Sequence, residues 1–101
     1  MNPSLELQLQ TLPNNPGVYQ YYDKDGKILY VGKAKNLKKR VSSYFNKNHD
    51  NAKTNVLVRK IVDIKHIVVA TEADALLLEN NLIKKLQPRY NINLKDDKSY
   101  P

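Results

Sequence analysis

The chain has 101 residues, with 17 Lys or Arg against 10 Asp or Glu, so its net charge is +7, and it contains no cysteine. This length predicts a single domain, and the lack of cysteine excludes disulfides, thiolate metal sites and cysteine nucleophiles. No apolar run approaches the roughly 20 residues of a membrane-spanning helix, and residues 1–12 lack a signal-peptide pattern, so we expect a cytoplasmic protein without a membrane partner. The excess of positive charge favours a nucleic acid as partner, although a basic surface can also serve solubility alone.

The first third of the chain predicts a helix and then a β-hairpin. Spaced leucines end at Pro13, so we expect residues 1–12 to form an N-terminal helix or arm. Residues 18–22 and 28–31 are rich in β-branched residues and tyrosine, and they flank Asp25-Gly26, a pair typical of hairpin turns. Such a turn pairs residues whose numbers have an odd sum of about 49 or 51, which places Tyr19 and Tyr30 on one face of the sheet.

The rest of the chain predicts three helices and one strand. Residues 36–45 form a basic amphipathic helix with Asn36 as its N-cap, a polar loop follows at 46–51, and a second helix covers 52–62. Residues 64–70 predict a strand buried on both faces, and residues 72–86 a helix capped by Thr71 and ended by Pro88. Three strands and about four helices predict an α/β fold with helices packed on a small sheet.

Three groups of side chains on these elements are candidates for a functional site. Tyr19 and Tyr30 are either core residues or catalytic hydroxyls, and the pattern leaves both readings open. Arg40 and Tyr44 lie four residues apart on one helix and so are neighbours, and an arginine suits bidentate binding of a phosphoryl group. Five cations without an intervening acid form either a solvated face or a DNA-binding surface: Lys33, Lys35, Lys38, Lys39 and Arg40.

Glu79 is the acidic residue that the helical pattern singles out. At 100° per residue it falls in the middle of an apolar face made by Ala75, Leu76, Leu82, Ile83 and Leu86. A buried, ionised carboxylate needs an arginine or lysine partner, a proton or a metal ion. A buried ion pair is one reading, and a site for one divalent cation, Mg²⁺ or Mn²⁺, is the other.

The spacing of several motifs resembles that of the GIY-YIG nucleases. Gly17-Val18-Tyr19 is followed after ten residues by Tyr30-Val31-Gly32, and Arg40, Glu79 and Asn91 come later in the order of that family. Longer runs, such as Tyr30 to Leu37 and the closing Lys-Ser-Tyr-Pro, resemble the N-terminal domain of the UvrC family of bacterial nucleotide excision repair.

This resemblance implies a small three-stranded antiparallel sheet flanked by helices, with residues 13–101 forming the nuclease domain of a longer protein. It implies that the domain cuts damaged double-stranded DNA 3′ to the lesion, that a UvrB-type protein loads it, and that the isolated domain is a monomer. It assigns the catalytic centre to Tyr30, Arg40 and Glu79, with the metal on Glu79 and with support from Tyr19, Lys33, Tyr44 and Asn91.

The expected mechanism uses a tyrosinate as general base, Tyr30 or alternatively Tyr19, while Arg40 binds the phosphate. Because a free tyrosine has a pKa near 10, nearby cations such as Lys33 have to favour the phenolate. Two other functions stay open: a nucleic-acid-binding module without catalysis, which has no need of Glu79, and another GIY-YIG endonuclease.

Overall fold

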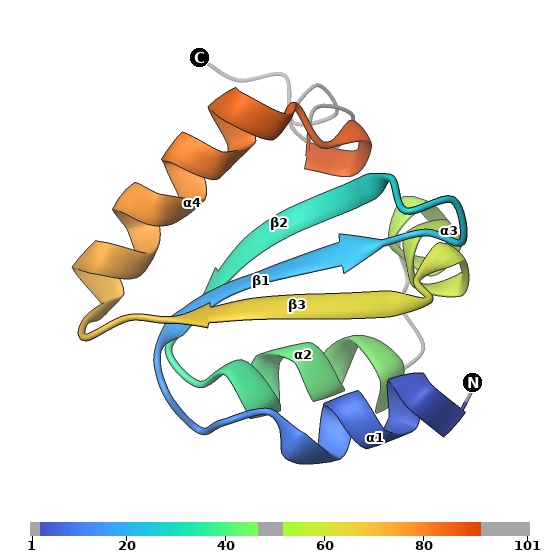
Figure 1. Ribbon diagram of the computed structural model, residues 1–101, viewed down its shortest axis with the longest axis horizontal. Helices are drawn as coiled ribbons and strands as arrows, with labels where there is room; N and C mark the ends of the chain where they lie inside the picture. The colour runs from blue at the N-terminus through green and yellow to red at the C-terminus, as the bar shows by residue number, and fades with distance from the viewer. Residues whose placement is uncertain (1–2, 47–51, 92–101) are drawn as a thin grey trace.

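The computed structural model describes residues 3–46 and 52–91, which form a three-stranded antiparallel sheet with helices on both sides (Figure 1). The strand order is β2-β1-β3, so the hairpin strands β1 and β2 are neighbours and β3 pairs with the other side of β1. In chain order the elements are α1 (Pro3–Thr11), β1 (Gly17–Tyr22), β2 (Ile28–Ala34), α2 (Leu37–Asn46), α3 (Ala52–Lys60), β3 (Asp63–Val68) and α4 (Glu72–Leu86). The predicted fold class is confirmed, and no helix in the described ranges is both long and apolar enough to span a bilayer.

The hairpin register is the one expected from the turn. From Gly17 opposite Ala34 to Tyr21 opposite Tyr30, the paired residue numbers sum to 51, and the register shifts by one residue only between Tyr21 and Tyr22. Gly26 adopts a φ of 77°, which favours glycine, and its N–H donates to the carbonyl of Asp23 at 3.0 Å. The turn therefore fixes which tyrosines share a face.

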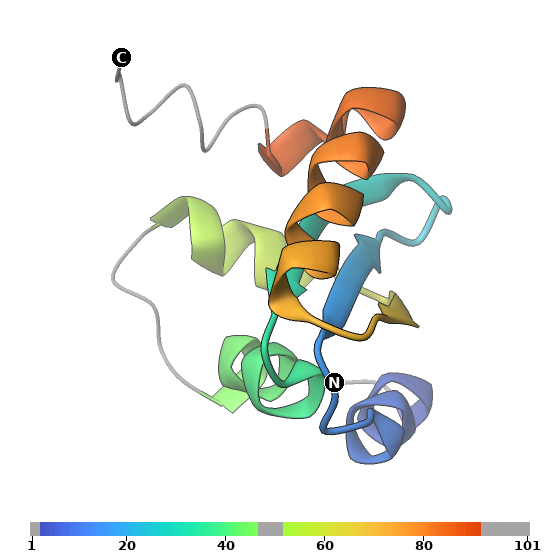
Figure 2. The same ribbon diagram turned by 90° about the vertical axis from the view of Figure 1, so that its left-hand side faces the viewer.

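The larger core lies between one face of the sheet and the helices α1, α2 and α3. In Figures 1 and 2, α1 and α2 lie side by side on the side of the sheet away from α4. The Gln8 side chain of α1 donates to the Asp63 carboxylate at 2.7 Å and accepts from the N–H of Ile64 at 3.2 Å, which fastens α1 to β3. The helix expected at residues 1–12 thus spans Pro3–Thr11, and its Leu5 is buried in the same core as the hairpin tyrosines.

The smaller core lies under α4, which covers β1 and β2 but not β3. Ala75 is fully enclosed against Val18 and Val31. The expectation that residues 64–70 are buried on both faces is wrong, because in β3 Ile67 and Val68 are 39% and 47% exposed and of its residues only Ile64 is buried. The strand is also shorter than expected and ends at Val68.

The helix ends follow the expected capping residues, with one difference in length. The Asn36 side chain accepts from the N–H of Lys39 at 3.0 Å, and the Thr71 hydroxyl accepts from the N–H of Asp74 at 3.2 Å. Helix α4 ends at Leu86, where Gln87 takes a left-handed φ of 48° before Pro88. Helix α3 ends at Lys60 rather than at residue 62, because Val62 instead donates its N–H to the carbonyl of Tyr22. Most of the expected loop, residues 47–51, and the tail from residue 92 lie outside the described residues.

Candidate active site

Four tyrosines meet on the face of the sheet that α2 covers. Tyr19, Tyr21 and Tyr30 come from the hairpin and Tyr44 from α2, and the Tyr19 and Tyr44 hydroxyl oxygens are 3.2 Å apart. Tyr21 stacks on Tyr30 with ring centroids 6.2 Å apart and meets the Tyr44 ring edge-on at 5.3 Å. The predicted proximity of Tyr19 and Tyr30 is confirmed at 6.2 Å between ring centroids. Tyr21 was not singled out from the sequence, although its spacing of two from Tyr19 places it on the same face.

The two glycines of the hairpin motif leave room for this cluster. A Cβ on Gly32 would collide with the ring and hydroxyl of Tyr19, so the Tyr19 side chain lies flat over that residue. A Cβ on Gly17 would collide with the carbonyl oxygen of Ile67 and would lie 2.7 Å from the side chain of Leu37. Any side chain at these positions would push β1 away from β3 or α2, or displace Tyr19.

The surroundings of Tyr19 and Tyr30 favour the protonated form of both phenols. Burial raises the pKa of Tyr19 and Tyr30, and neighbouring Tyr44 raises both further. The cation that lowers these values is Arg40, not Lys33 as expected, and burial outweighs it. The protein's own cations therefore do not provide the phenolate that the expected mechanism requires.

Tyr21→Phe is expected to raise the free energy of unfolding by about 1 kcal/mol, since a buried hydroxyl without a partner costs desolvation. Within the described residues the Tyr21 hydroxyl has no hydrogen-bond partner. Burial also raises the pKa of Tyr21 above its usual value. The unfolded chain therefore releases this proton first, so the wild type loses stability as the pH rises above about 10 and the variant loses less.

Urea unfolding at pH 7 and pH 10.5 checks both expectations. The matched control is Tyr19→Phe, which loses the contact of the Tyr19 hydroxyl with Tyr44 and is expected to be destabilised. Destabilisation of Tyr21→Phe by as much as Tyr19→Phe would contradict this account of the Tyr21 hydroxyl.

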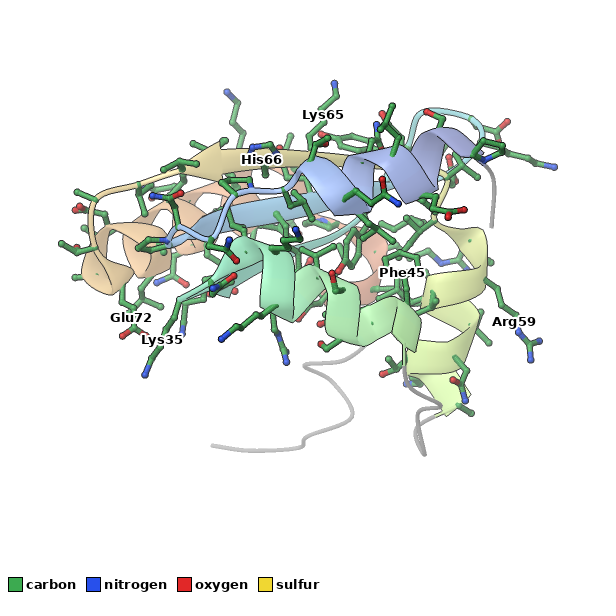
Figure 3. All side chains as sticks on the ribbon, turned by 90° about the horizontal axis from the view of Figure 1, so that it is seen from below. Lys35, Phe45, Arg59, Lys65, His66 and Glu72 are labelled. Carbon is green, nitrogen blue, oxygen red and sulfur yellow. The ribbon has the colours of Figure 1, made fainter. Side chains whose placement is uncertain are left out.

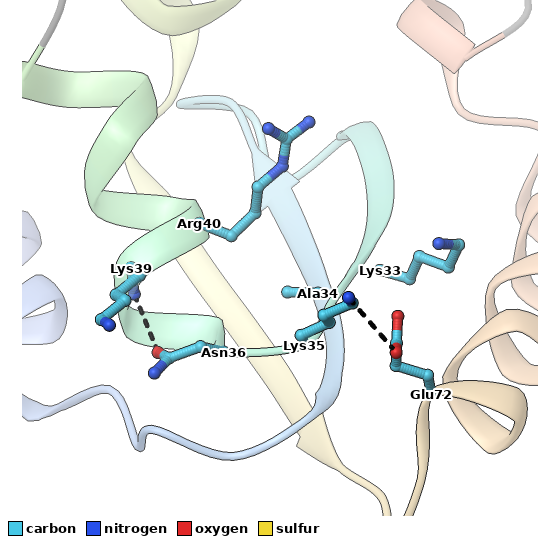
Figure 4. A pocket seen from close by; sticks show the side chains of 7 residues that line it. All are labelled: Lys33, Ala34, Lys35, Asn36, Lys39, Arg40 and Glu72. Atoms are coloured by element: carbon cyan, nitrogen blue, oxygen red, sulfur yellow. Dashed lines mark hydrogen bonds and ion pairs between the residues drawn. The ribbon is translucent and has the colours of Figure 1, made fainter.

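Arg40 connects the tyrosine cluster to a basic groove. Its guanidinium carbon lies 5.2 Å from the centre of the Tyr44 ring, and the neighbouring Tyr19 raises the pKa of Arg40 further above its usual range. The groove, with a volume of about 470 Å³, lies between the end of β2, the start of α2 and the start of α4 (Figure 4). It is lined by Lys33, Ala34, Lys35, Asn36, Lys39, Arg40 and Glu72. The predicted basic block is thus brought together except for Lys38, which does not line this groove.

One carboxylate lies at the rim of this groove. Lys35 Nζ is 3.8 Å from a carboxylate oxygen of Glu72, and both side chains are largely exposed. Figures 3 and 4 show the two residues facing each other across the gap between β2 and α4. Such an exposed pair contributes little stability, so a phosphate can compete for Lys35 at small cost.

Glu79 lies among the residues of α4 that face the sheet, but it is half-buried rather than enclosed, and two of the apolar neighbours expected around it are exposed. The residues of α4 that pack on the sheet are Ala75, Leu78, Leu82 and Ile83, whereas Leu76 and Leu86 are 45% and 36% exposed. At 100° per residue Glu79 falls between Ala75 and Ile83, which both pack in the core with Val18 and Val31, and Glu79 itself is half-buried. Its charge raises the pKa of Tyr30, which places the carboxylate near that phenol.

The chemistry of Glu79 fits a cation rather than an ion pair. In the described ranges no Lys or Arg forms an ion pair with it, so the alternative of a buried salt bridge finds no partner there. No group of three or more His, Cys, Asp or Glu side chains gathers in the described part of the chain. A single carboxylate suits Mg²⁺, which keeps several waters and accepts one or two protein carboxylates plus substrate phosphate.

Asn91 supports β2 immediately beside Tyr30. Its side-chain oxygen accepts from the N–H of Val31 at 2.7 Å, and its side-chain nitrogen donates to the carbonyl of Val31 at 2.9 Å. Asn91 is 5% exposed, and its amide takes the place of a neighbouring strand at the outer edge of β2. The structure therefore gives Asn91 a positioning contact with the strand that carries Tyr30.

Comparison with known proteins agrees with these features. The family model described as a UvrC-like GIY-YIG domain matches residues 15–92. The chain is 88% identical over 98 residues to UvrABC system protein C of Flavobacterium psychrophilum and 86% identical over 99 residues to that of Flavobacterium johnsoniae. These matches cover 97% and 98% of this chain but only 16% and 17% of the relatives, so the chain spans about one sixth of their length.

A solved structure extends the comparison to three dimensions. The crystal structure of the GIY-YIG N-terminal endonuclease domain of UvrC from Thermotoga maritima, bound to its catalytic cation magnesium, matches with a TM-score of 0.78 and 37% identity. The match covers 89% of this chain and 98% of that one. By its sequence, its hairpin motif and its fold, the chain belongs to the UvrC-like GIY-YIG family.

Proposed function

We propose that this domain is a divalent-cation-dependent endonuclease that hydrolyses a phosphodiester of damaged double-stranded DNA, as part of the UvrABC system. In nucleotide excision repair it makes the cut 3′ to the lesion. The observation that carries the proposal is the position of Glu79, a half-buried carboxylate with no cationic partner in the described ranges. It lies near Tyr30, which belongs to the tyrosine cluster that Arg40 contacts through Tyr44. A domain that only binds nucleic acid gains nothing from a negative charge at this place.

Glu79 is the residue proposed to hold the cation, Mg²⁺ or Mn²⁺. Its half-buried side chain keeps a path to solvent, so a cation bound there can retain several waters and accept a substrate phosphate. When bound, the cation supplies positive charge that stabilises the oxygen leaving the cleaved bond.

The groove is proposed to bind the DNA backbone. Lys33, Lys35 and Lys39 present compact charges to successive phosphates, whereas the planar guanidinium of Arg40 can bind the reacting phosphoryl group through two hydrogen bonds. The contact of Arg40 with the Tyr44 ring holds the guanidinium at the side of the groove nearest the tyrosines. Lys38 lies outside this groove, and its contact with DNA stays a prediction.

Tyr30 is the better candidate for the general base, and Tyr19 is the alternative. Tyr30 is half-buried and therefore closer to solvent, whereas Tyr19 is 1% exposed. Because burial raises the pKa of both phenols, Tyr30 requires positive charge beyond that of Arg40 before it can accept a proton from water. Tyr19 and Tyr44 then orient Tyr30 and Arg40, and Asn91 fixes the strand beside them.

Tyr30→Phe is expected to lower the single-turnover rate of cleavage by about 10²-fold or more, the usual contribution of a general base. Tyr19→Phe is expected to lower it less, because that hydroxyl is enclosed and acts through Tyr44. The measurement compares both variants in a full-length protein that carries this domain, with saturating Mg²⁺ and loading partner. A larger loss in Tyr19→Phe than in Tyr30→Phe would exchange the two roles.

The partners of the whole protein follow from the same proposal. The relatives are UvrABC system proteins, so we expect a UvrB-type protein to deliver the domain to the lesion. We expect this to take place in the cytoplasm, and we expect the isolated domain to be a monomer.

A further inference from the structure

A second basic pocket lies at the opposite end of the hairpin from the groove. It has a volume of about 530 Å³ and is formed by the β1–β2 turn, the last turn of α3 and the residue after Pro88. It is lined by Asp23, Lys24, Asp25, Lys27, Arg59, Lys60, Val62 and Arg89. Five of these side chains are cationic and two are acidic, so the pocket carries an excess of positive charge.

The cations of this pocket lack acidic partners in the described ranges. None of the five forms an ion pair there. One of the two carboxylates of the pocket, that of Asp23, instead accepts hydrogen bonds from the N–H groups of Asp25 at 2.9 Å and Lys27 at 3.0 Å, and so stabilises the turn. Five cations that share a pocket with only two carboxylates repel one another, and an anion placed among them reduces that repulsion.

Two of the cations are held together by one aromatic ring. Lys60 Nζ lies 5.9 Å and the guanidinium carbon of Arg89 5.8 Å from the centre of the Tyr90 ring. Tyr90 is 6% exposed and belongs to the larger core, so its ring is a fixed support. Cations positioned over a buried ring are better ordered than free surface lysines. Lys60 and Arg89 come from segments far apart in sequence, α3 and the residues after α4, and the ring brings them together.

The pocket and the groove lie at the two ends of β2. Lys27 in the pocket precedes the strand and Lys33 in the groove is near its end, so six residues of extended chain separate them by roughly 20 Å. Figure 3 shows Arg59 at one end of the molecule and Lys35 at the other. Since neighbouring phosphates of one DNA strand advance about 3.4 Å along the helix axis, this separation corresponds to about six base pairs. Tyr30 lies in the strand between them.

We propose that the pocket formed by Lys24, Lys27, Arg59, Lys60 and Arg89 is a second phosphate-binding site, which binds the DNA backbone about six base pairs from the phosphates in the groove. The inference rests on the proposed function, since it takes DNA as the ligand. Together the two sites fix the direction of the duplex across Tyr30, so that one phosphodiester is presented to the catalytic groups.

The test measures how the affinity of this chain for a 16-base-pair duplex depends on salt concentration. Binding is monitored through changes in amide chemical shifts, which detect weak complexes. The double variant Lys60→Gln/Arg89→Gln is expected to bind roughly tenfold more weakly at low salt, with a slope of log K against log salt smaller by about 1 to 2. The matched control is Lys65→Gln, an exposed lysine outside both pockets that also lies over a tyrosine ring, 5.1 Å from the centre of Tyr22. We expect this control to bind like the wild type.

A separate variant distinguishes failure of the inference from failure of the proposed function. Lys33→Gln/Lys39→Gln removes two charges from the groove and is expected to weaken binding as well. If this variant weakens binding while Lys60→Gln/Arg89→Gln does not, the second site is overturned and DNA binding by the groove stands. If neither variant changes binding, or if Lys65→Gln weakens it equally, both the second site and the groove as the DNA surface are overturned.

Discussion

Glu79→Gln is expected to abolish binding of a divalent cation to the free domain. Glu79 is the half-buried carboxylate beside Tyr30, and no cluster of acidic or histidine side chains in the described part of the chain could replace it. The amide keeps the size of the side chain but loses the charge, and Mg²⁺ and Mn²⁺ bind carboxylates far better than neutral amides. Electron paramagnetic resonance of free Mn²⁺ measures the loss directly.

The control for this prediction is Asp74→Asn, which removes an exposed carboxylate from the same helix. Asp74 is on the first turn of α4, and its carboxylate has no ion-pair partner within the described residues. We expect it to bind Mn²⁺ like the wild type, and we expect the unfolding curve of Glu79→Gln to match that of the wild type. Unchanged Mn²⁺ binding by Glu79→Gln would remove Glu79 from the metal site.

Arg40→Ala is expected to lower the rate of cleavage by about 10²- to 10³-fold while weakening DNA binding only several-fold. A fixed cation next to the reacting phosphoryl group stabilises charge that develops in the transition state, which affects the rate more than the affinity. Arg40 lines the basic groove and also contacts the tyrosine cluster, and the other groove cations are proposed to bind the phosphate backbone as well. Single-turnover cleavage and binding of the same duplex separate the two effects.

Two further variants make this result specific. Arg40→Lys keeps the charge but loses the planar pair of donors, so it is expected to recover only part of the rate. Lys65→Ala removes a cation over another tyrosine ring, outside the groove, and is expected to cleave normally. Full activity in Arg40→Lys would show that the positive charge alone matters and not the planar pair of donors. Equal losses of cleavage rate and DNA affinity in Arg40→Ala would show that Arg40 only binds DNA and does not stabilise the transition state.

The parts of the fold that depend on local chemistry were predictable from the sequence. The hairpin register follows from the position of Asp25-Gly26, and it brings Tyr19 and Tyr30 together. The caps Asn36 and Thr71 follow from the hydrogen bonds that short polar side chains make to free N–H groups. Each of these features is determined within a few residues of the chain.

The features that were missed depend on how elements pack. An apolar β3 was expected to be buried on both faces, but α4 covers β1 and β2 instead, so Ile67 is exposed. The same packing leaves Leu76 exposed, because Leu78 rather than Leu76 meets the sheet. Periodicity alone gives a helix an apolar side but not the angle at which it meets its neighbour.

The site shows the same division between local pattern and packing. The motif spacing identified Tyr30, Arg40 and Glu79, and the structure brings Arg40 and Glu79 close enough to affect the pKa of Tyr30. Burial, however, is set by residues distant in sequence, and it raises the pKa of Tyr30 where the expected mechanism required the phenolate to be favoured. The pocket around Tyr90 joins three segments that have no common sequence motif.

The central claim is that Glu79 makes this domain a metal-dependent nuclease. It is tested most directly by incision 3′ to a lesion in a pre-incised duplex, using a full-length protein that carries this domain together with its loading partner and Mg²⁺. The account predicts that Glu79→Gln loses the cut by about 10³-fold or more, while DNA binding is unchanged or slightly stronger and Asp74→Asn cuts normally. Normal cutting by Glu79→Gln would contradict the account and leave the domain as a DNA-binding module.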